Sequence, residues 1–207
     1  MTEDEAIEWL GGHFDERQFT ALQRFVDLIE AERPRQNLIS PSSAEAIWAR
    51  HVVDSAQLLA LAPSAGCWCD IGTGAGFPGM VVAILHDGPV TMIEPRRKRA
   101  EFLQRCIDDL GLQSTVLQER AETARIETMD VVSARAVASI ADLLKSARHF
   151  STEKTRFVLP RGRTGRDEIA NAKAAWHGMF HVEHSVTDPD SVIVSINGVR
   201  PRCSASR

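Results

Sequence analysis

From Asp70 to Gly79 the chain reads Asp-Ile-Gly-Thr-Gly-Ala-Gly-Phe-Pro-Gly, directly after a short apolar run that begins at Cys67. A glycine-rich turn between a strand and a helix lets the backbone approach a ligand that a residue with a Cβ would obstruct. The helix that follows directs its first amides at that ligand, and Pro78 suits its first turn because proline has no amide hydrogen to lose. The stretch therefore predicts a strand, a ligand-binding turn and a helix.

Short apolar strands alternate with helices after this turn. We expect strands at 67–71, 90–94, 115–118, 129–134 and 156–159, and helices near 78–86, 97–110, 138–149 and 166–177. Such alternation is typical of an α/β fold with a mostly parallel sheet wrapped by helices. The final runs, 182–186 and 191–196, leave no room for a helix between them, so we expect the sheet to end in an antiparallel hairpin.

The residues before the first strand predict a helical segment. Apolar residues recur three and four apart over 15–32, the period of an amphipathic helix. A second helix is expected to begin at Ser42, which with Glu45 makes a capping box, and to run to about Leu61. We therefore expect a helical cap over 1–61, packed on a Rossmann-like domain over 62–207.

Composition indicates an ordinary globular protein. Hydrophobic residues make up 43% and charged residues 25% of the 207 residues. No apolar run approaches the roughly 20 residues of a membrane helix, and the acidic start at 2–5 is unlike a signal peptide. The cysteines at 67, 69, 106 and 203 show neither zinc spacing nor a disulfide framework, so we expect no metal and a cytoplasmic location.

The net charge of −4 conceals an uneven distribution. Residues 1–32 hold nine of the 28 acidic residues and only two of the 24 lysines and arginines. The remaining chain is therefore mildly basic. This distribution permits a partner that carries phosphates.

Two ligand classes fit the glycine turn. Residues 74–79 match the dinucleotide pattern G-x-G-x-x-G, and Glu94 follows at about the expected distance of 20 residues. However, Asp70 would repel a pyrophosphate, whereas its carboxylate could face the positive amino and sulfonium groups of S-adenosylmethionine. The glycines also begin early, at Gly72 and Gly74, with no basic residue in the turn. These features favour S-adenosylmethionine over a dinucleotide.

Acidic residues after the next two strands complete the expected cofactor site. Glu94 ends its strand, and its two oxygens could accept hydrogen bonds from both ribose hydroxyls, although a solvated strand-end acid is the alternative. Ala121 and Glu122 follow the third strand, where we expect the adenine to lie.

Several motifs in residues 37–138 resemble those of one family, the small-subunit ribosomal RNA guanine-N7 methyltransferases called RsmG or GidB. They are Asn37-Leu38-Ile39, Arg50 to Ser55, Asp70 to Gly79, Lys98-Arg99 with Phe102-Leu103, Arg120-Ala121-Glu122, and Ser133 to Ala138. The resemblance implies a Rossmann-like class I methyltransferase with an N-terminal helical cap. Its cofactor would be S-adenosyl-L-methionine, and its substrate 16S ribosomal RNA or the small ribosomal subunit, methylated at N7 of a guanine. It also implies cofactor-site roles for Gly72, Phe77, Ala121, Glu122 and Arg135.

The chain departs from the family at two places. The family usually carries a tryptophan-asparagine pair where this chain has Arg33-Pro34-Arg35-Gln36. It also usually ends its fifth strand in leucine-lysine-glycine, where this chain has Leu159-Pro160-Arg161-Gly162-Arg163. The second departure keeps positive charge but changes the backbone.

The residues after the fourth strand bear on the chemistry. The Asn/Asp-Pro-Pro-aromatic motif typical of exocyclic-amine methylation is absent, and Cys203 is poorly placed as a nucleophile for pyrimidine C5. Arg135 stands there instead, and we expect it to orient the cofactor carboxylate or the target guanine, with a structural ion pair as the alternative. Guanine N7 already exposes a lone pair, so its methylation needs alignment and no general base.

Other charged groups leave two interpretations open. Residues 96–99 form the densest basic run, and Arg161, Arg163 and Arg166 form a second; each could bind phosphate or be solvated surface. His51 and Asp54 share a helix face, which favours a structural role. A small-molecule methyltransferase and a nicotinamide-dependent oxidoreductase remain the competing functions.

Overall fold

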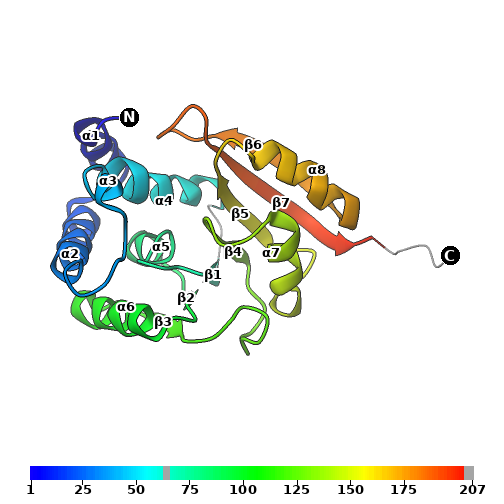
Figure 1. Cartoon of the computed structure of the whole chain (residues 1–207), viewed down its shortest axis with the longest axis horizontal. Coiled ribbons are helices and arrows are strands. Elements are labelled where there is room, and N and C mark those ends of the chain that lie inside the picture. The colour runs from blue at the N-terminus through cyan, green and yellow to red at the C-terminus, as the bar shows by residue number, and fades with distance from the viewer. Residues whose placement is uncertain (63–65, 203–207) are drawn as a thin grey trace.

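The computed structural model describes residues 1–62 and 66–202, and its centre is a seven-stranded sheet (Figure 1). The strands are β1 Trp68–Ile71, β2 Val90–Ile93, β3 Ser114–Leu117, β4 Val131–Ser133, β5 Arg156–Arg161, β6 Trp176–His184 and β7 Val192–Pro201. They lie in the order β3-β2-β1-β4-β5-β7-β6. The first five are parallel, and β7 pairs antiparallel with both β5 and β6. The predicted α/β fold with an antiparallel end is confirmed.

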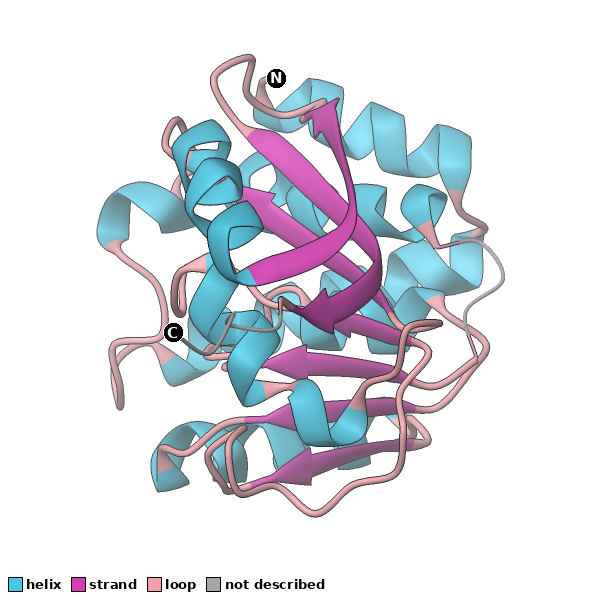
Figure 2. Cartoon of the chain, turned by 90° about the vertical axis from the view of Figure 1, so that its right-hand side faces the viewer, coloured by secondary structure: helices cyan, strands magenta, loops and turns pink. Residues whose placement is uncertain are grey.

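Helices cover both faces of the sheet (Figure 2). They are α1 Glu3–His13, α2 Glu16–Glu32, α3 Pro41–Ala44, α4 Asp54–Ala56, α5 Gly79–Leu85, α6 Arg97–Leu110, α7 Ile140–Ser146 and α8 Gly165–Ala175. A π-helical turn spans Trp48–Val53, and 3-10 turns span Gln57–Leu61 and Arg148–Phe150. One face of the sheet packs against the N-terminal helices with α5 and α6, and the other against α7 and α8.

The alternation of side chains along the strands produces two hydrophobic cores. Trp68 of β1 points into the core that contains Leu22 and Phe25 of α2, while its neighbour Cys69 points into the opposite core. Both residues are fully buried. Residues before β1 therefore share a core with the sheet.

The N-terminal region differs in detail from the prediction. Helix α1 was not predicted; Thr2 and Glu5 form its capping box. The predicted helix over 42–61 is instead a series of short helical turns. Ser40, and not Ser42, is the N-cap of the first of them, with Pro41 in its first turn, and this helix already ends at Ala44. Further on, Pro78 occupies the N-cap of α5 and not its first turn.

The terminal hairpin is longer than expected. Helix α8 ends at Ala175, and β6 begins at Trp176, a residue that we had placed in the helix. Most of β6 is exposed, because β6 is the edge strand of the sheet. Polar residues on both sides of an edge strand remove the alternation that would have revealed it.

The described residues contain no helix with the length and apolar character needed to cross a membrane. Cys67, Cys69 and Cys106 are free thiols, and Cys203 lies outside the described residues.

Candidate active site

The glycine turn after β1 forms the floor of a cavity. Gly72, Gly74 and Gly76 have φ angles of +66°, +61° and +104°, in the left-handed region that glycine tolerates best. A Cβ at Gly72 would lie 2.6 Å from Cγ2 of Val137, and one at Gly76 would lie 2.7 Å from the ring of Phe25. The turn therefore adopts this shape because these positions lack side chains.

A cavity of about 480 Å³ lies over this turn, and we call it the cofactor cavity. Five residues predicted to bind the cofactor line it: Gly72, Gly74, Phe77, Glu94 and Arg135. The strand ends carry them to one edge of the sheet, where ligands bind in open α/β folds. The structure thus brings together residues that are up to 63 positions apart in the chain.

Glu94 is the acidic group of the cofactor cavity. It is 3% exposed, and its Oε2 accepts a hydrogen bond from the Gly74 amide at 2.9 Å while its Oε1 accepts one from the Arg96 amide at 2.8 Å. Each carboxylate oxygen has two acceptor sites, so one on each oxygen remains for a ligand. A vicinal diol such as a ribose would match this pair of acceptors. The residues present therefore fit an adenosyl cofactor.

Asp70 does not reach the cavity, which corrects the role predicted for it. Its side chain is 0% exposed; Oδ2 accepts a hydrogen bond from the Gly79 amide at 2.9 Å, and Oδ1 accepts one from Ser133 Oγ at 2.7 Å. Burial raises the pKa of this carboxyl to about 6. Asp70 ties the start of α5 to β4 from below the turn, and its charge faces protein groups and no ligand.

Ala121 and Glu122 do not line the cofactor cavity either. Ala121 is buried in the core beside α7, and Glu122 is exposed in the turn that follows β3. Because β3 neighbours β2, this turn lies at the same edge of the sheet as Glu94. Contact with an adenine stays a prediction for both residues.

Arg135 follows β4 and lies against the π-helical turn. Its Nη1 donates to Arg50 O at 2.9 Å and to Asp54 Oδ2 at 3.1 Å, and its Nη2 lies 2.7 Å from His51 Nδ1. The guanidinium also sits 5.5 Å from the centre of the Phe77 ring. A π-helical turn is rare and occurs often at functional sites. Here the turn supplies two of the three acceptors of Arg135, and Asp54, directly after the turn, supplies the third.

His51 can accept from Arg135 only while it is neutral. Burial, together with the charges of Arg135 and Arg50, lowers the pKa of His51 to about 3. Its ring stacks on Phe77 with centroids 4.7 Å apart. We had favoured a structural role for His51 and Asp54; the structure places both in contact with a predicted site residue, which the i, i+3 spacing alone could not indicate.

A second cavity, of about 540 Å³, adjoins the first, and we call it the acceptor cavity. The two cavities share four lining residues: Ser43, His51, Arg135 and Ala136. Ala136 has a φ of +55°, an uncommon conformation for a residue with a Cβ. No pattern in the sequence indicates this conformation, which sequence reasoning therefore missed.

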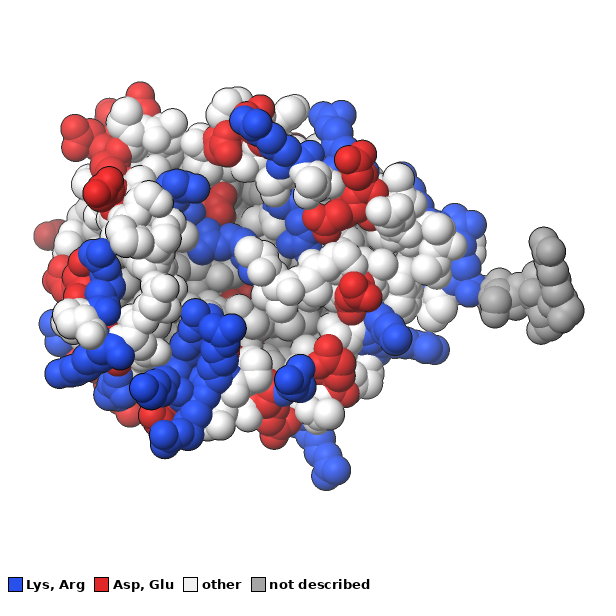
Figure 3. All heavy atoms as spheres, in the orientation of Figure 1, with Lys and Arg blue, Asp and Glu red and all other residues white. Residues whose placement is uncertain are grey.

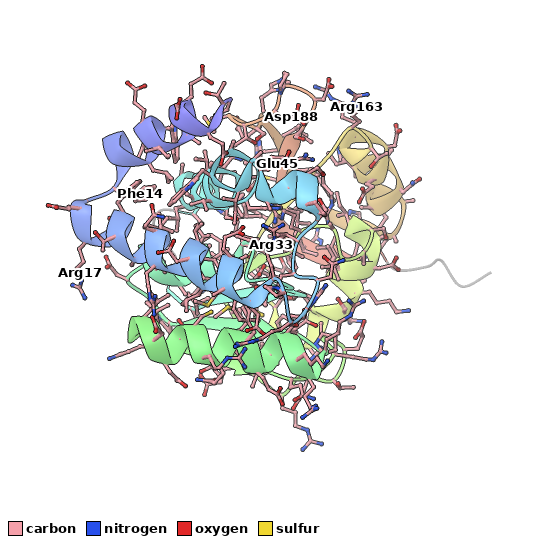
Figure 4. All side chains as sticks on the ribbon, turned by 60° about the vertical axis from the view of Figure 1, so that its left-hand side comes forward. Phe14, Arg17, Arg33, Glu45, Arg163 and Asp188 are labelled. Atoms are coloured by element: carbon pink, nitrogen blue, oxygen red, sulfur yellow. The ribbon has the colours of Figure 1, made fainter. Side chains whose placement is uncertain are left out.

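The basic residues after β5 divide into two kinds. Arg161 is 7% exposed; its Nη1 donates to Ala134 O at 3.1 Å and to Pro160 O at 2.8 Å, and its Nε lies 3.2 Å from Glu168. It therefore supports the segment before Arg135 from within the protein, and it also lines the acceptor cavity. Arg163 is exposed and pairs with Asp190 at the rim of the molecule (Figure 4).

No cluster suited to a metal ion, meaning three or more His, Cys, Asp or Glu side chains, occurs within residues 1–62 and 66–202.

Solved structures with a similar fold include methyltransferases of several kinds. A putative O-methyltransferase from Klebsiella pneumoniae aligns with a TM-score of 0.60 at 13% identity, over 95% of this chain and 96% of that one. A variant of MtNAS in complex with S-adenosylmethionine aligns with a TM-score of 0.60 at 14% identity, over 86% of this chain and 71% of that one. These similarities establish the fold.

Sequence relatives are much closer. Ribosomal RNA small subunit methyltransferase G of Rhizorhabdus wittichii is 43% identical over 98% of this chain and 95% of its own length. The protein of the same name from Zymomonas mobilis is 38% identical over 98% of this chain and 96% of its own length. The family model of GidB, rRNA small subunit methyltransferase G, matches residues 18–190. The chain therefore belongs to the GidB family, rRNA small subunit methyltransferase G.

Proposed function

We propose that this chain transfers the methyl group of S-adenosylmethionine to N7 of a guanine in 16S ribosomal RNA, with the cofactor in the cofactor cavity and the guanine in the acceptor cavity. Membership of the family supports ribosomal RNA methylation with this cofactor. The guanine, its N7 position and the place of each ligand are our assignment. A ribosomal substrate would place the reaction in the cytoplasm.

The position of Arg135 between the two cavities is the observation that carries this proposal. A guanidinium has five N–H donors, and Arg135 uses three of them on Arg50, Asp54 and His51. The Nε–H and one Nη2 hydrogen have no hydrogen-bond partner among the described residues. These donors suit an acceptor in either cavity, such as the cofactor carboxylate or O6 of a guanine.

The surrounding residues support transfer to a nitrogen that needs no deprotonation. When bound, the cofactor supplies a methyl group made electrophilic by its sulfonium. His51, the titratable base that both cavities share, is held neutral with Nδ1 engaged by Arg135, and its Nε2 is buried. His51 is thus poorly placed to remove a proton from the acceptor, and guanine N7 requires no such step because its lone pair is exposed. The chain's contribution is to hold two ligands in line.

Residues 1–61 complete both cavities, and we propose that they act as a cap. Ser43 and His51 line the cofactor and acceptor cavities together. Arg50 and Asp54 line the acceptor cavity but not the cofactor cavity. The reaction would accordingly require the N-terminal segment to be docked on the sheet.

A direct test uses small ribosomal subunits, and separately deproteinised 16S rRNA, from cells that lack the endogenous enzyme. Each is incubated with the purified chain and radiolabelled S-adenosylmethionine, and the RNA is then treated with borohydride and aniline, which cleave at N7-methylguanine. We expect label and one new cleavage site in at least one substrate. Label without cleavage would refute the N7 assignment, and no label in either RNA would refute the RNA substrate.

The variant Arg135→Ala distinguishes the two ligands proposed for the free donors of Arg135, the cofactor carboxylate and the guanine. If the arginine binds the cofactor carboxylate, the Kd of S-adenosylmethionine rises; if it binds the guanine, kcat/KM for RNA falls at an unchanged cofactor Kd. The matched control is Arg148→Ala, because Arg148 is exposed and lines neither cavity. A variant with wild-type values of both quantities would contradict the role of Arg135.

A further inference from the structure

The N-terminal turn of α6 carries positive charge where a helix disfavours it. Arg96 is the N-cap residue, Arg97, Lys98 and Arg99 follow, and the first turn contains no acidic residue and no side-chain cap. The positive end of a helix dipole repels cations placed there. Helix α1, in contrast, begins with Glu3, Asp4 and Glu5 behind a Thr2 cap. A local rule that a helix breaks in this way points to a function.

A second basic segment lies against this turn, although it is distant in the sequence. Gln36 Nε2 donates to Lys98 O at 3.2 Å, and Arg99 Nη2 donates to Asn37 O at 3.4 Å. The segment from Arg33 to Asn37 therefore docks along the start of α6, and residues 33–37 line a hollow of about 470 Å³. Arg33 lies where α2 ends (Figure 4).

The two segments together form a positively charged surface, which we call the basic surface. Its seven cationic residues are Arg33, Arg35, Arg96, Arg97, Lys98, Arg99 and Arg105. Lys and Arg side chains gather on the part of the molecule over α6, whereas Asp and Glu gather over α1 (Figure 3). The side chains of Arg35 and Arg97 are 75% and 70% exposed.

The carboxylates nearby do not neutralise this surface. Glu30, Glu32 and Glu101 pair with four of the cations, and Glu32 serves two of them. Within the described part of the chain, Arg96, Lys98 and Arg99 have no carboxylate within 4.0 Å. Repulsion among these cations and with the helix end would be relieved by an anion bound near the Arg97 and Lys98 amides, because the amides of Arg96 and Arg99 already donate to Glu94 and to Arg96 O.

We propose that the basic surface binds the sugar-phosphate backbone of the RNA substrate, next to the nucleotide that enters the acceptor cavity. Arg96 and Arg99 also line the cofactor cavity, so the surface leads directly to the site. None of its residues lines the acceptor cavity, which keeps backbone binding apart from recognition of the base. The proposal rests on the RNA substrate proposed above.

The test measures the affinity of the chain for whichever RNA substrate the wild type methylates, as a function of KCl concentration. Arg35→Gln, Lys98→Gln and the double variant each remove exposed charge from the basic surface. Each single change is expected to weaken binding and to reduce the slope of log K against log [KCl] by about 0.7 to 0.9, the value of one phosphate contact. The matched control is Arg148→Gln with Arg200→Gln, two exposed residues outside both cavities.

Three results would overturn the proposal. The first is a double variant whose affinity and salt slope equal those of the control. The second is a loss of affinity with an unchanged slope and a lower urea midpoint, since we expect Lys98→Gln to leave the midpoint equal or to raise it. The third is a loss of binding to phosphatidylglycerol vesicles with RNA binding intact, which would assign the surface to a membrane. If the wild type methylates no RNA, the proposed function itself is refuted, and this result is distinct from the three that refute the role of the basic surface.

Discussion

His51 should make the protein less stable in acid, and His51→Gln should remove that loss. In the unfolded chain a histidine titrates near pH 6.5, whereas the pKa of His51 in the folded protein is about 3. Between these values the unfolded chain binds a proton that the folded protein does not. Stability therefore falls as the pH falls through this window.

The expected size of the effect follows from the two pKa values. At pH 5 the unfolded histidine is almost fully protonated and folded His51 almost fully neutral, which lowers the free energy of unfolding by about 2 kcal/mol relative to pH 8. A folded pKa one unit higher would leave this figure nearly unchanged, because it would still lie below pH 5. Glutamine keeps an acceptor for Arg135 and does not titrate, so His51→Gln should lack the loss.

Urea unfolding at pH 5 and pH 8 measures the effect. The readout is the difference between wild type and variant, because Asp70 opposes His51: its raised pKa stabilises the folded protein in acid, and this contribution is common to both proteins. His181→Gln is the control, since His181 is exposed on β6. If wild type and His51→Gln lose the same free energy between pH 8 and pH 5, the neutral and buried state of His51 is refuted.

Three further predictions concern the glycine turn and its two carboxylates. Gly72→Ala should lower the free energy of unfolding, measured in urea, by about 1 kcal/mol, because a residue with a Cβ is strained at a φ of +66°. The control Gly11→Ala, at a position in α1 with open space around it, should stabilise the protein. Equal effects of the two substitutions would contradict the strain at Gly72. Glu94→Gln should raise the Kd of S-adenosylmethionine by about 10- to 100-fold through the loss of a charged acceptor, measured by calorimetry; exposed Glu101→Gln should not, and an unchanged Kd in Glu94→Gln would remove the ribose role. As the pH rises from about 4 to 6, Asp70 should lower the free energy of unfolding by up to about 3 kcal/mol, because the folded protein holds this proton more tightly than the unfolded chain. Asp70→Asn should not show this decrease. Unfolding curves with the same pH dependence in both proteins would contradict the raised pKa.

The sheet could be predicted from sequence because its strands are short, apolar and separated by helical periods. Short-range patterns also placed Glu94 and Gly72 correctly in one cavity, since strand ends in a parallel sheet meet at one edge. Such patterns could not predict the conformation of the segment after Ser40. Its irregular turns depend on packing against the rest of the protein, such as the Glu3 carboxylate that accepts from the amides of Trp48 and Ala49.

Local charge in the sequence predicted the right cofactor, but Asp70 does not have the role on which that prediction depended. Asp70 was expected to repel phosphate, yet it is buried beneath the turn. The turn itself contains no lysine or arginine, but Arg96 and Arg99 reach the cofactor cavity from the start of α6. A sequence shows which charges are near in the chain, whereas a cavity collects charges that are near in space. The family comparison, and not local charge, distinguishes the cofactor.

The partners of Arg135 lie 81 to 85 residues earlier in the chain. The site therefore joins two segments that are far apart in the chain, and each holds the side chains of the other in place. Replacement of Arg135 would remove the donor that Arg50, His51 and Asp54 share, and replacement of His51 or Asp54 would remove an acceptor of the arginine. Among descendants of this protein, replacements at these positions should accordingly occur as matched pairs and seldom singly.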